Sequence, residues 1–285
     1  MKIISDLKGV RDVVREWKSE GQSIGLVPTM GNLHEGHLSL ITGATARADR
    51  TAVSIFVNPI QFGHGEDYEH YPSTLEQDLT VLSNAGVDLV FAPNLRELYP
   101  AGIEADTRVT VPDISDILCG ESRPSHFSGV ATVVMKLFIN VQPDYAFFGE
   151  KDYQQALVVK RMVSDLLLPV EILTLPIIRE KSGLAMSSRN GYLDASEKKV
   201  ATEIYKVIVN AATMVKSRVK TFNEIENVCE RILNQAGFQV EYFSIRRQED
   251  LKLAKDSDLN LIILTAAWIG DTRLIDNVRI NLSNE

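Results

Sequence analysis

Cysteine is scarce in this chain. The 285 residues include only Cys119 and Cys229, and neither belongs to a Cys-x-x-Cys pair or a Cys/His group with metal-ligand spacing. The sequence therefore predicts no disulfide framework, and it favours the reducing cytoplasm as the location of the protein.

Long apolar runs and an excess of basic residues are also lacking. No apolar run is long enough to cross a bilayer, and the opening residues MKIISDLKGV have no signal-peptide core, so neither a membrane partner nor secretion is predicted. The formal net charge of −8 argues against a nucleic-acid partner, because nucleic-acid binders usually carry basic faces. A local positive pocket inside an acidic shell is still compatible with this charge, and a nucleotide enzyme needs such a pocket.

The composition that is present is that of a folded, water-soluble protein. Hydrophobic residues make up 45% of the chain and charged residues 24%. A chain of this length can bury one large core or two modest ones. No internal repeat or low-complexity segment interrupts it.

The N-terminal half alternates short β-type runs with helical runs, which predicts an α/β fold with a Rossmann-like parallel sheet. A capping box between Ser73 and Glu76 is predicted to open one of its helices. The expected strands are Ser23–Pro28, Thr51–Val57, Asp88–Phe91, Asp144–Phe148 and Val170–Leu173. The expected helices are Glu35–Ala48, Ser73–Asn84, Ser128–Asn140 and Asp152–Leu167.

The pattern changes after Pro176, where we expect a domain boundary. Asp194 and Glu197 form a second candidate capping box, at the start of a helix that is expected to run to Ser217. A helix at Phe222–Ala236 and β-type runs at 241–246, 260–266 and 272–280 follow. The sequence thus predicts a domain at residues 1–176 and a second, smaller α+β domain at residues 177–285.

The strongest chemical signal is the segment VPTMGNLHEGH at residues 27–37, where the first expected strand gives way to a helix. Such a junction is a preferred ligand site in an open α/β sheet, and a helix N-terminus offers N–H donors to anions. Gly31 and Gly36 would let the backbone approach a nucleotide. His34 and His37 could donate hydrogen bonds to a reacting polyphosphate. The alternatives are a metal-binding pair and two ordinary, partly buried side chains.

Three further sets of polar residues are candidates for the same site. Gln61 follows the second expected strand, and its neutral amide can bond both a hydroxyl and a carboxylate. Lys151, in the run Gly-Glu-Lys-Asp, is a compact cation suited to phosphate. Ser187, Ser188 and Arg189 offer two hydroxyls and a guanidinium on an expected loop. The alternative for each set is a solvated side chain.

Five sequence blocks together resemble one family. They are PTMGNLHEGH at 28–37, SIFVNPIQF at 54–62, HFSGVATVV at 126–134, FFGEKDYQQ at 147–155 and MSSRN at 186–190. The first block is similar to the His-x-x-His signature of the HIGH-type nucleotidyltransferase superfamily. The five blocks in order resemble the pantoate–β-alanine ligase (pantothenate synthetase) family, and GDTRLIDN at 270–277 is similar to its C-terminal end. Ser73 and Ser125 depart from the family pattern, which often has arginine and glycine there.

The resemblance implies ATP-dependent condensation of (R)-pantoate with β-alanine through a pantoyl-adenylate, with release of pyrophosphate and AMP. It implies an ATP- and pantoate-binding catalytic domain at 1–176, a lid domain at 177–285, a homodimer, and Mg²⁺ that binds mainly with ATP. Asp78 is a conceivable additional carboxylate for the metal. His34, His37 and Lys151 are implied to be catalytic, and Gln61 and Gln155 to bind pantoate, with Gln61 also facing β-alanine. The implied ATP contacts are Met30, Gly31, Asn32, Leu33, His34, Glu35, Gly36, His37, Gly149, Glu150, Lys151, Asp152, Ile178, Met186, Ser187, Ser188 and Arg189.

Three other functions stay open from the residues alone. They are another adenylating enzyme of the same superfamily, a tRNA-binding synthetase fragment, and a non-catalytic ATP-binding module. The acidic charge and the short C-terminal part disfavour the second. The several convergent polar groups disfavour the third, because a binder needs fewer of them.

Overall fold

A computed structural model of the chain describes residues 1–63 and 65–282, which form two compact units. The first unit comprises Met1–Glu150 and Gln154–Pro176, and the second comprises Lys151–Tyr153 and Ile177–Glu285. The division at Pro176 thus has one exception, because Lys151–Tyr153 group with the second unit. The catalytic and lid roles expected for the two parts stay predictions.

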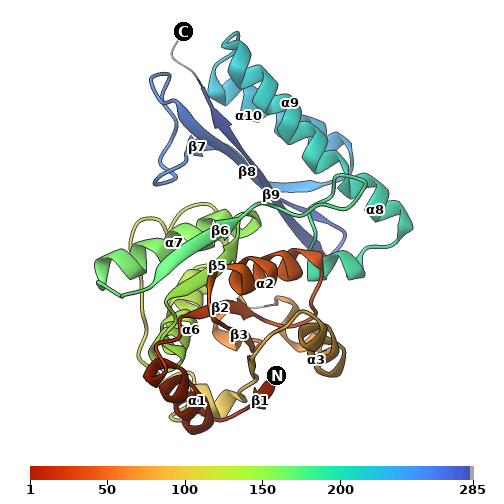
Figure 1. The fold of residues 1–285 in the computed structure, drawn as a ribbon. Coiled ribbons are helices and arrows are strands. Elements are labelled where there is room, and N and C mark those ends of the chain that lie inside the picture. Colours follow the sequence, from red (N-terminus) through yellow and green to blue (C-terminus); the bar gives the residue numbers. More distant parts are fainter. Residues whose placement is uncertain (64, 283–285) are drawn as a thin grey trace. The chain divides into compact units, whose positions relative to one another are not determined.

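A six-stranded sheet forms the centre of the first unit, with strand order β1-β4-β3-β2-β5-β6 (Figure 1). All neighbouring strands are parallel. The strands are β1 Lys2–Ile4, β2 Ile24–Thr29, β3 Arg50–Ile55, β4 Leu89–Phe91, β5 Tyr145–Gly149 and β6 Glu171–Leu175. The predicted Rossmann-like parallel sheet is therefore confirmed.

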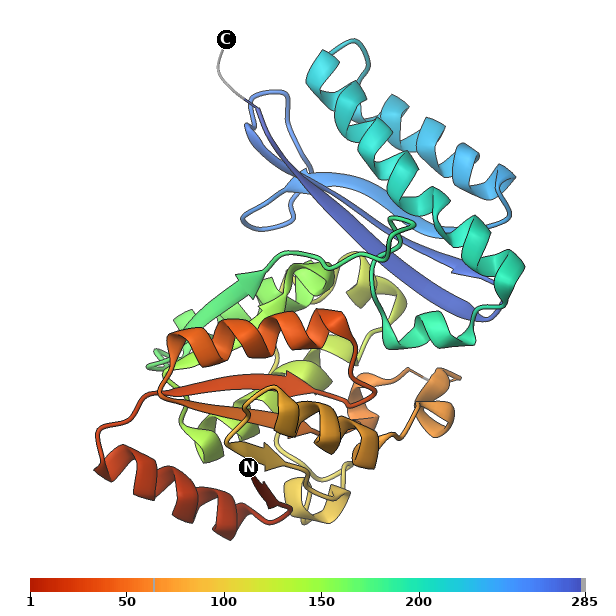
Figure 2. The same cartoon turned by 45° about the vertical axis from the view of Figure 1, so that its right-hand side comes forward.

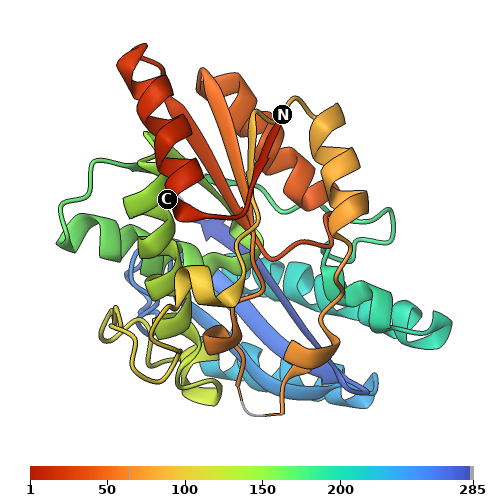
Figure 3. The ribbon, with the colours of Figure 1, turned by 90° about the horizontal axis from the view of Figure 1, so that it is seen from below.

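Helices join these strands and cover the sheet. The α-helices of this unit are α1 Leu7–Ser19, α2 Glu35–Arg47, α3 Leu75–Asn84, α4 Leu95–Leu98, α5 Cys119–Ser122, α6 His126–Val141 and α7 Tyr153–Asp165, the last of which starts in the second unit. Helix α1 packs beside α6 (Figure 3). Neither α1 nor β1 was among the elements predicted from the sequence. The signal for α1 was present, because Val10, Val13, Val14 and Trp17 are buried at helical spacing after the N-cap Asp6.

The order of the strands places a topological switch point between β2 and β5. From β2 the chain continues through β3 to β4 on one side of the sheet, whereas β5 and β6 lie on the other side. In open α/β sheets a crevice forms outside the carboxyl ends of the strands at such a point, and ligands bind there. The carboxyl end of β2 leads directly into the segment that holds His34 and His37.

The second unit is an α+β fold, as predicted. Its antiparallel sheet has the order β7-β8-β9, and α9 and α10 lie side by side on one face of it (Figure 2). Buried side chains from the two helices and the sheet form one continuous core, which includes Ile208, Cys229 and Ile263. The elements are α8 Ala195–Ala201, α9 Glu203–Ser217, α10 Phe222–Gln235, β7 Gln239–Arg247, β8 Asn260–Ile269 and β9 Thr272–Asn281.

Two local predictions were wrong. The N-cap of α3 is Thr74 and not Ser73, so the Ser73–Glu76 capping box does not form; the Thr74 hydroxyl instead donates to the Asp78 carboxylate (Oγ1···Oδ2 3.1 Å). The single helix expected up to Ser217 is divided into α8 and α9 at Thr202, whose hydroxyl bonds back to the carbonyl of Lys199.

Other local predictions are confirmed. The capping box between Asp194 and Glu197 is present at the start of α8. Along the ranges 1–63 and 65–282, no helix has both the length and the apolar character needed to span a membrane.

The partly buried carboxyl group of Glu226 links α10 to β7 in the second unit, and it can ionise. Its carboxylate accepts the backbone N–H of Ile245 in β7 (Oε1···N 2.6 Å), and burial raises the pKa of this carboxyl, against the smaller opposing effects of that hydrogen bond and of Arg246. An acid with a raised pKa binds more protons in the folded state, so the free energy of unfolding falls as the pH rises from the unfolded pKa through the folded one.

We therefore expect Glu226→Gln, which keeps an acceptor oxygen but cannot ionise, to unfold at a higher temperature than the wild type at pH 7. The difference in Tm should close below about pH 4, where the carboxyl is protonated in both states. Thermal unfolding followed by circular dichroism across this pH range measures it. A Tm difference that is independent of pH would contradict the prediction.

Candidate active site

The segment Pro28–His37, called the signature segment below, turns sharply between β2 and α2. Gly31 and Asn32 have φ angles of +84° and +51°, in the left-handed region that glycine and asparagine tolerate best. A Cβ on Gly31 would lie 3.1 Å from Asp78 Oδ2 and 3.2 Å from Ile55 Cγ2. Glycine is therefore required here for both its conformation and its small size.

Asp78 of α3 holds this turn in place. Its two carboxylate oxygens accept the backbone N–H groups of Asn32 and Leu33, each at 2.9 Å, and the side chain is almost fully buried. Because both oxygens are already engaged by the turn, the idea that Asp78 assists a metal is not supported. The positioning role was not predicted from the sequence, although a carboxylate on the same helix face as the buried Leu82 was a signal for it.

The two histidines of the signature segment have a defined orientation. His34 is the N-cap of α2, and its Nδ1 accepts the backbone N–H of Gly36 at 3.1 Å. The Nδ1 of His37 accepts the backbone N–H of His34 at 3.3 Å, and the two ring centroids are 4.1 Å apart. A backbone N–H can only donate, so each Nδ1 is an acceptor without a proton. In the neutral rings the proton is therefore on Nε2, which makes each Nε2–H a hydrogen-bond donor.

This arrangement gives no support to a metal-binding pair, whereas the capping contacts are compatible with two ordinary, partly buried side chains. Among the residues for which the structure gives positions, no group of three or more His, Cys, Asp or Glu side chains could hold a metal ion. Both rings are half-buried at the N-terminus of α2, and their Nδ1 atoms help to cap it.

Gln61 lies in a 3₁₀ turn, Pro59–Gln61, after β3. Its side-chain amide donates to the sulfur of Met30, so Gln61 and the signature segment are brought together. Its backbone carbonyl accepts from His126 Nδ1 at 2.7 Å and from the guanidinium of Arg123 at 3.2 Å. Gly129 lets α6 approach this turn, because a Cβ there would lie 2.7 Å from the backbone nitrogen of Gln61.

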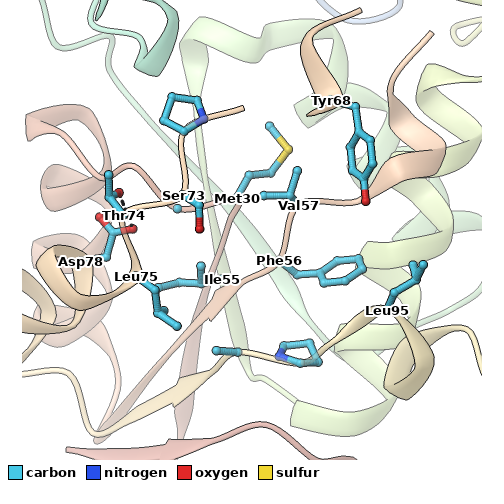
Figure 4. Close-up of a pocket in the computed structure, with 14 residues that line it drawn as sticks. Met30, Ile55, Phe56, Val57, Tyr68, Ser73, Thr74, Leu75, Asp78 and Leu95 are labelled. Atoms are coloured by element: carbon cyan, nitrogen blue, oxygen red, sulfur yellow. Dashed lines mark hydrogen bonds between the residues drawn. The ribbon is translucent and has the colours of Figure 1, made fainter. Parts of the chain in front are cut away.

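A pocket of about 280 Å³ opens at the carboxyl ends of β2, β3 and β4 (Figure 4). Met30, Phe56, Val57 and Tyr68 give it mainly apolar walls, and Ser73 and Thr74 add two hydroxyl groups to its lining. The pocket meets the signature segment at Met30 and Gly31, and neither histidine nor Gln61 lines it. Met30 thus contacts both the pocket and the amide of Gln61.

The remaining candidates of the first unit lie around the end of β5. Gly149 ends this strand, and Glu150 begins a 3₁₀ turn that leads into α7. Within α7 the two adjacent glutamines differ. Gln154 is buried and bonds the carbonyls of Ile114 and Ile117. Gln155 is only half-buried, so it is the member of the pair that can reach a ligand.

The other candidates belong to the second unit. Lys151 and Asp152 form an ion pair (Nζ···Oδ1 3.8 Å), with the lysine side chain 20% exposed. The backbone N–H of Met186 donates to the carbonyl of Ile178 at 3.0 Å, and Ser187 caps the turn that holds Ser188 and Arg189. The structure therefore divides the predicted ATP contacts between its two units.

A helix N-terminus beside two imidazoles at the switch point of a parallel sheet is typical of α/β proteins that bind nucleotides. The model of the family described as Pantoate-beta-alanine ligase matches residues 2–279. The chain belongs to this family, which confirms the resemblance seen in the sequence. It is accordingly an enzyme, a ligase that forms pantothenate.

Similar proteins agree over the full length of the chain. The pantothenate synthetase of Idiomarina loihiensis is 53% identical over 268 residues, covering 94% of this chain and 95% of the relative. That of Alkalilimnicola ehrlichii is 47% identical over 285 residues, with complete coverage of both.

Solved structures give the same result. The structure of pantothenate synthetase from Thermus thermophilus matches with a TM-score of 0.90 at 42% identity, covering 98% of this chain and 99% of that one. The pantoate-beta-alanine ligase of Francisella tularensis, complexed with beta-gamma ATP and beta-alanine, matches with a TM-score of 0.82 at 36% identity, covering 98% and 97%.

The Asp78 contacts give a testable consequence. Asp78→Asn keeps the shape of the side chain but offers one acceptor oxygen, so one of the two N–H groups of the turn loses its partner. We expect a loss of about 1–3 kcal/mol in the free energy of unfolding, the usual cost of an unsatisfied buried group, together with a higher KM for ATP. Urea unfolding and steady-state kinetics measure the two effects.

Asp12→Asn on the exposed face of α1 is the matched control. Asp12 forms an exposed ion pair with Arg15, so the variant should stay within about 0.5 kcal/mol of the wild type. Equal stability and equal KM in Asp78→Asn would mean that the carboxylate does not hold the turn.

Proposed function

We propose that this chain activates (R)-pantoate with ATP to form a pantoyl-adenylate, and that β-alanine then attacks this intermediate to give pantothenate. The single observation that carries the proposal is the orientation of His34 and His37 at the end of β2. Both Nδ1 atoms accept backbone N–H groups, so both Nε2–H groups are donors suited to a polyphosphate. The full-length match to pantoate–β-alanine ligases supports the choice of substrates.

The adenylate route follows from the chemistry of the acid. A carboxylate is a poor electrophile, whereas its mixed anhydride with AMP has a good leaving group. In the first step a carboxylate oxygen attacks the α-phosphorus of ATP, the bond to the β-phosphate oxygen breaks, and pyrophosphate leaves. In the second step the amine nitrogen attacks the acyl carbon, the bond to AMP breaks, and the amine loses a proton.

Residues of the first unit are proposed to contact pantoate and ATP. His34 and His37 bear negative charge that develops on the phosphates, and backbone groups of Met30–His37 contact ATP. Gln61 and Gln155 hold pantoate, with Gln61 also facing β-alanine. In this structure the Gln61 amide donates to the sulfur of Met30, a weak acceptor, so a substrate oxygen can replace that contact at little cost.

Residues of the second unit are also proposed to contact ATP. Lys151 contributes a compact cation next to Gly149, Glu150 and Asp152 in sequence. Ile178 is proposed to contact ATP. The loop Met186–Arg189 would meet the phosphates through Ser187, Ser188 and Arg189, whose fork of donors matches phosphate oxygens.

The cofactor, assembly and location are also proposals. Mg²⁺ would arrive with ATP, because this ion keeps several waters and is usually held through substrate phosphates, where it offsets their charge. We propose a homodimer, since twofold assemblies are the commonest, and the cytoplasm as the location. The partners are then pantoate, β-alanine and ATP, without nucleic acid or membrane.

The proposed route can be tested in its first half. Pantoate, ATP and Mg²⁺ should support exchange of labelled pyrophosphate into ATP without β-alanine, and β-alanine should be needed only for release of AMP and product. His34→Ala and His37→Ala should each slow this exchange about 10²–10³-fold, the usual loss for one preorganised donor, with unchanged circular dichroism.

The other outcomes identify the alternatives. Release of ADP would indicate an acyl-phosphate route, and exchange that does not depend on pantoate would indicate another adenylating enzyme. ATP binding without exchange would indicate a binding module. Each of these results from well-folded protein would overturn the proposed function.

A further inference from the structure

Strand β9 carries two adjacent buried polar residues, Asp276 and Asn277, each only 4% exposed. Successive side chains of a strand point to opposite faces, so a strand with one covered face would bury only one of the two. Buried polar groups need hydrogen-bond partners. The partners of these two residues lie in segments of the second unit that the proposed function assigns to ATP.

Asp276 pairs with Arg179 through two parallel hydrogen bonds. The guanidinium donates to the two carboxylate oxygens at 2.6 and 2.8 Å, and both side chains are largely buried. Arg179 also donates to the carbonyl of Gly183 at 3.1 Å, and its guanidinium carbon lies 3.7 Å from the ring centroid of Tyr205. Together, these contacts fix the orientation of the planar guanidinium group of Arg179.

Arg179 lies in a short hairpin that leads into the loop Met186–Arg189. It forms an antiparallel bridge with Ala185, and the N–H of Met186 donates to the carbonyl of Ile178 at 3.0 Å. The φ angle of Gly183 is +93°, which only glycine adopts readily, and it allows the hairpin to turn. Asp276 therefore anchors the base of the loop proposed to meet the phosphates.

Asn277 holds the backbone at Lys151. Its side-chain amide donates to the backbone carbonyl of Lys151 at 3.0 Å. The lysine side chain is flexible, so the position of its backbone decides which region the ammonium group can reach. Adjacent Cα atoms in a strand are about 3.8 Å apart, so the two anchors are at a fixed separation.

We propose that Asp276 and Asn277 are positioning residues for ATP, which hold the loop Met186–Arg189 and Lys151 in register with each other. This inference rests on the proposed ATP roles of those two segments. It assigns a function to the C-terminal motif GDTRLIDN at residues 270–277, which the site as described does not use.

Asn277→Asp is the direct test, because it keeps the shape of the side chain but turns a carboxylate oxygen toward the carbonyl of Lys151. We expect kcat/KM for ATP in the exchange reaction to fall about 10- to 100-fold, as for a catalytic group displaced by about 1 Å, while the KM for pantoate stays within about twofold. If this variant does not fold, Asn277→Ser removes the amide without adding charge.

Thr265→Val is the matched control. Thr265 is a buried residue of β8 opposite Asp276 in the register, and its hydroxyl donates to the carbonyl of Tyr242 at 2.8 Å. Its loss should lower the Tm and leave the kinetics with ATP unchanged. Equal kinetic losses in Thr265→Val and Asn277→Asp would show a purely structural role and overturn the proposal.

A double-mutant cycle distinguishes action through Lys151 from a general effect. In the Lys151→Ala background, Asn277→Asp should lower kcat/KM for ATP by less than about twofold, because the group that Asn277 positions is already gone. Arg179→Lys, which loses the fork, should likewise be non-additive with Arg189→Ala. Fully additive losses in both cycles would overturn the inference.

The failure of this inference and the failure of the proposed function give different results. If Lys151→Ala and Arg189→Ala leave the ATP kinetics unchanged, the proposed roles of these segments are wrong. If those variants are impaired but Asn277→Asp and Arg179→Lys have wild-type ATP kinetics, only the positioning role fails.

Discussion

The rest of the site depends on one contact: the carboxylate of Asp78 with the backbone N–H groups of Asn32 and Leu33. A turn that contains two successive left-handed residues is not favourable by itself. Once it is fixed, the chain enters α2 with His34 as the N-cap, and each imidazole then accepts one backbone N–H. A buried anion 46 residues along the chain from Asn32 thus decides which nitrogen of each imidazole can donate.

The same division of tasks recurs through the molecule. Buried polar side chains such as Gln154 and Asp276 hold other segments of the chain in place. The candidates to meet substrates, Gln155 and the loop Met186–Arg189, are half-buried. Rigid support of this kind is what catalytic groups need, since a small displacement of a reacting group is costly. In the Gln154–Gln155 pair, the buried glutamine holds the backbone, and the half-buried one is the residue proposed to meet a ligand.

The sequence predicted the parallel sheet, the small C-terminal fold and the position of the signature segment, because these depend on local periodicity and on motifs. It did not predict the N-cap at Thr74, since the hydroxyl there is engaged by Asp78 and competes with regular capping. The interruption of the helix at Thr202 was also not predicted. The capping box at Asp194 marks the start of a helix, and the helical periodicity runs on past Thr202. The supporting role of Asn277 depends on a contact with a residue 126 positions away, which no local pattern reveals.

The backbone contacts of the signature segment make Nε2 the proton-bearing nitrogen of both His34 and His37. Long-range ¹H–¹⁵N NMR of protein labelled at histidine, at about pH 8, where an ordinary imidazole is neutral, reports the tautomer of each ring directly. Single His→Ala variants assign the signals. We expect the Nε2–H tautomer for both residues. A protonated Nδ1 in either ring would contradict it, because that nitrogen could not then accept the backbone N–H that orients the ring.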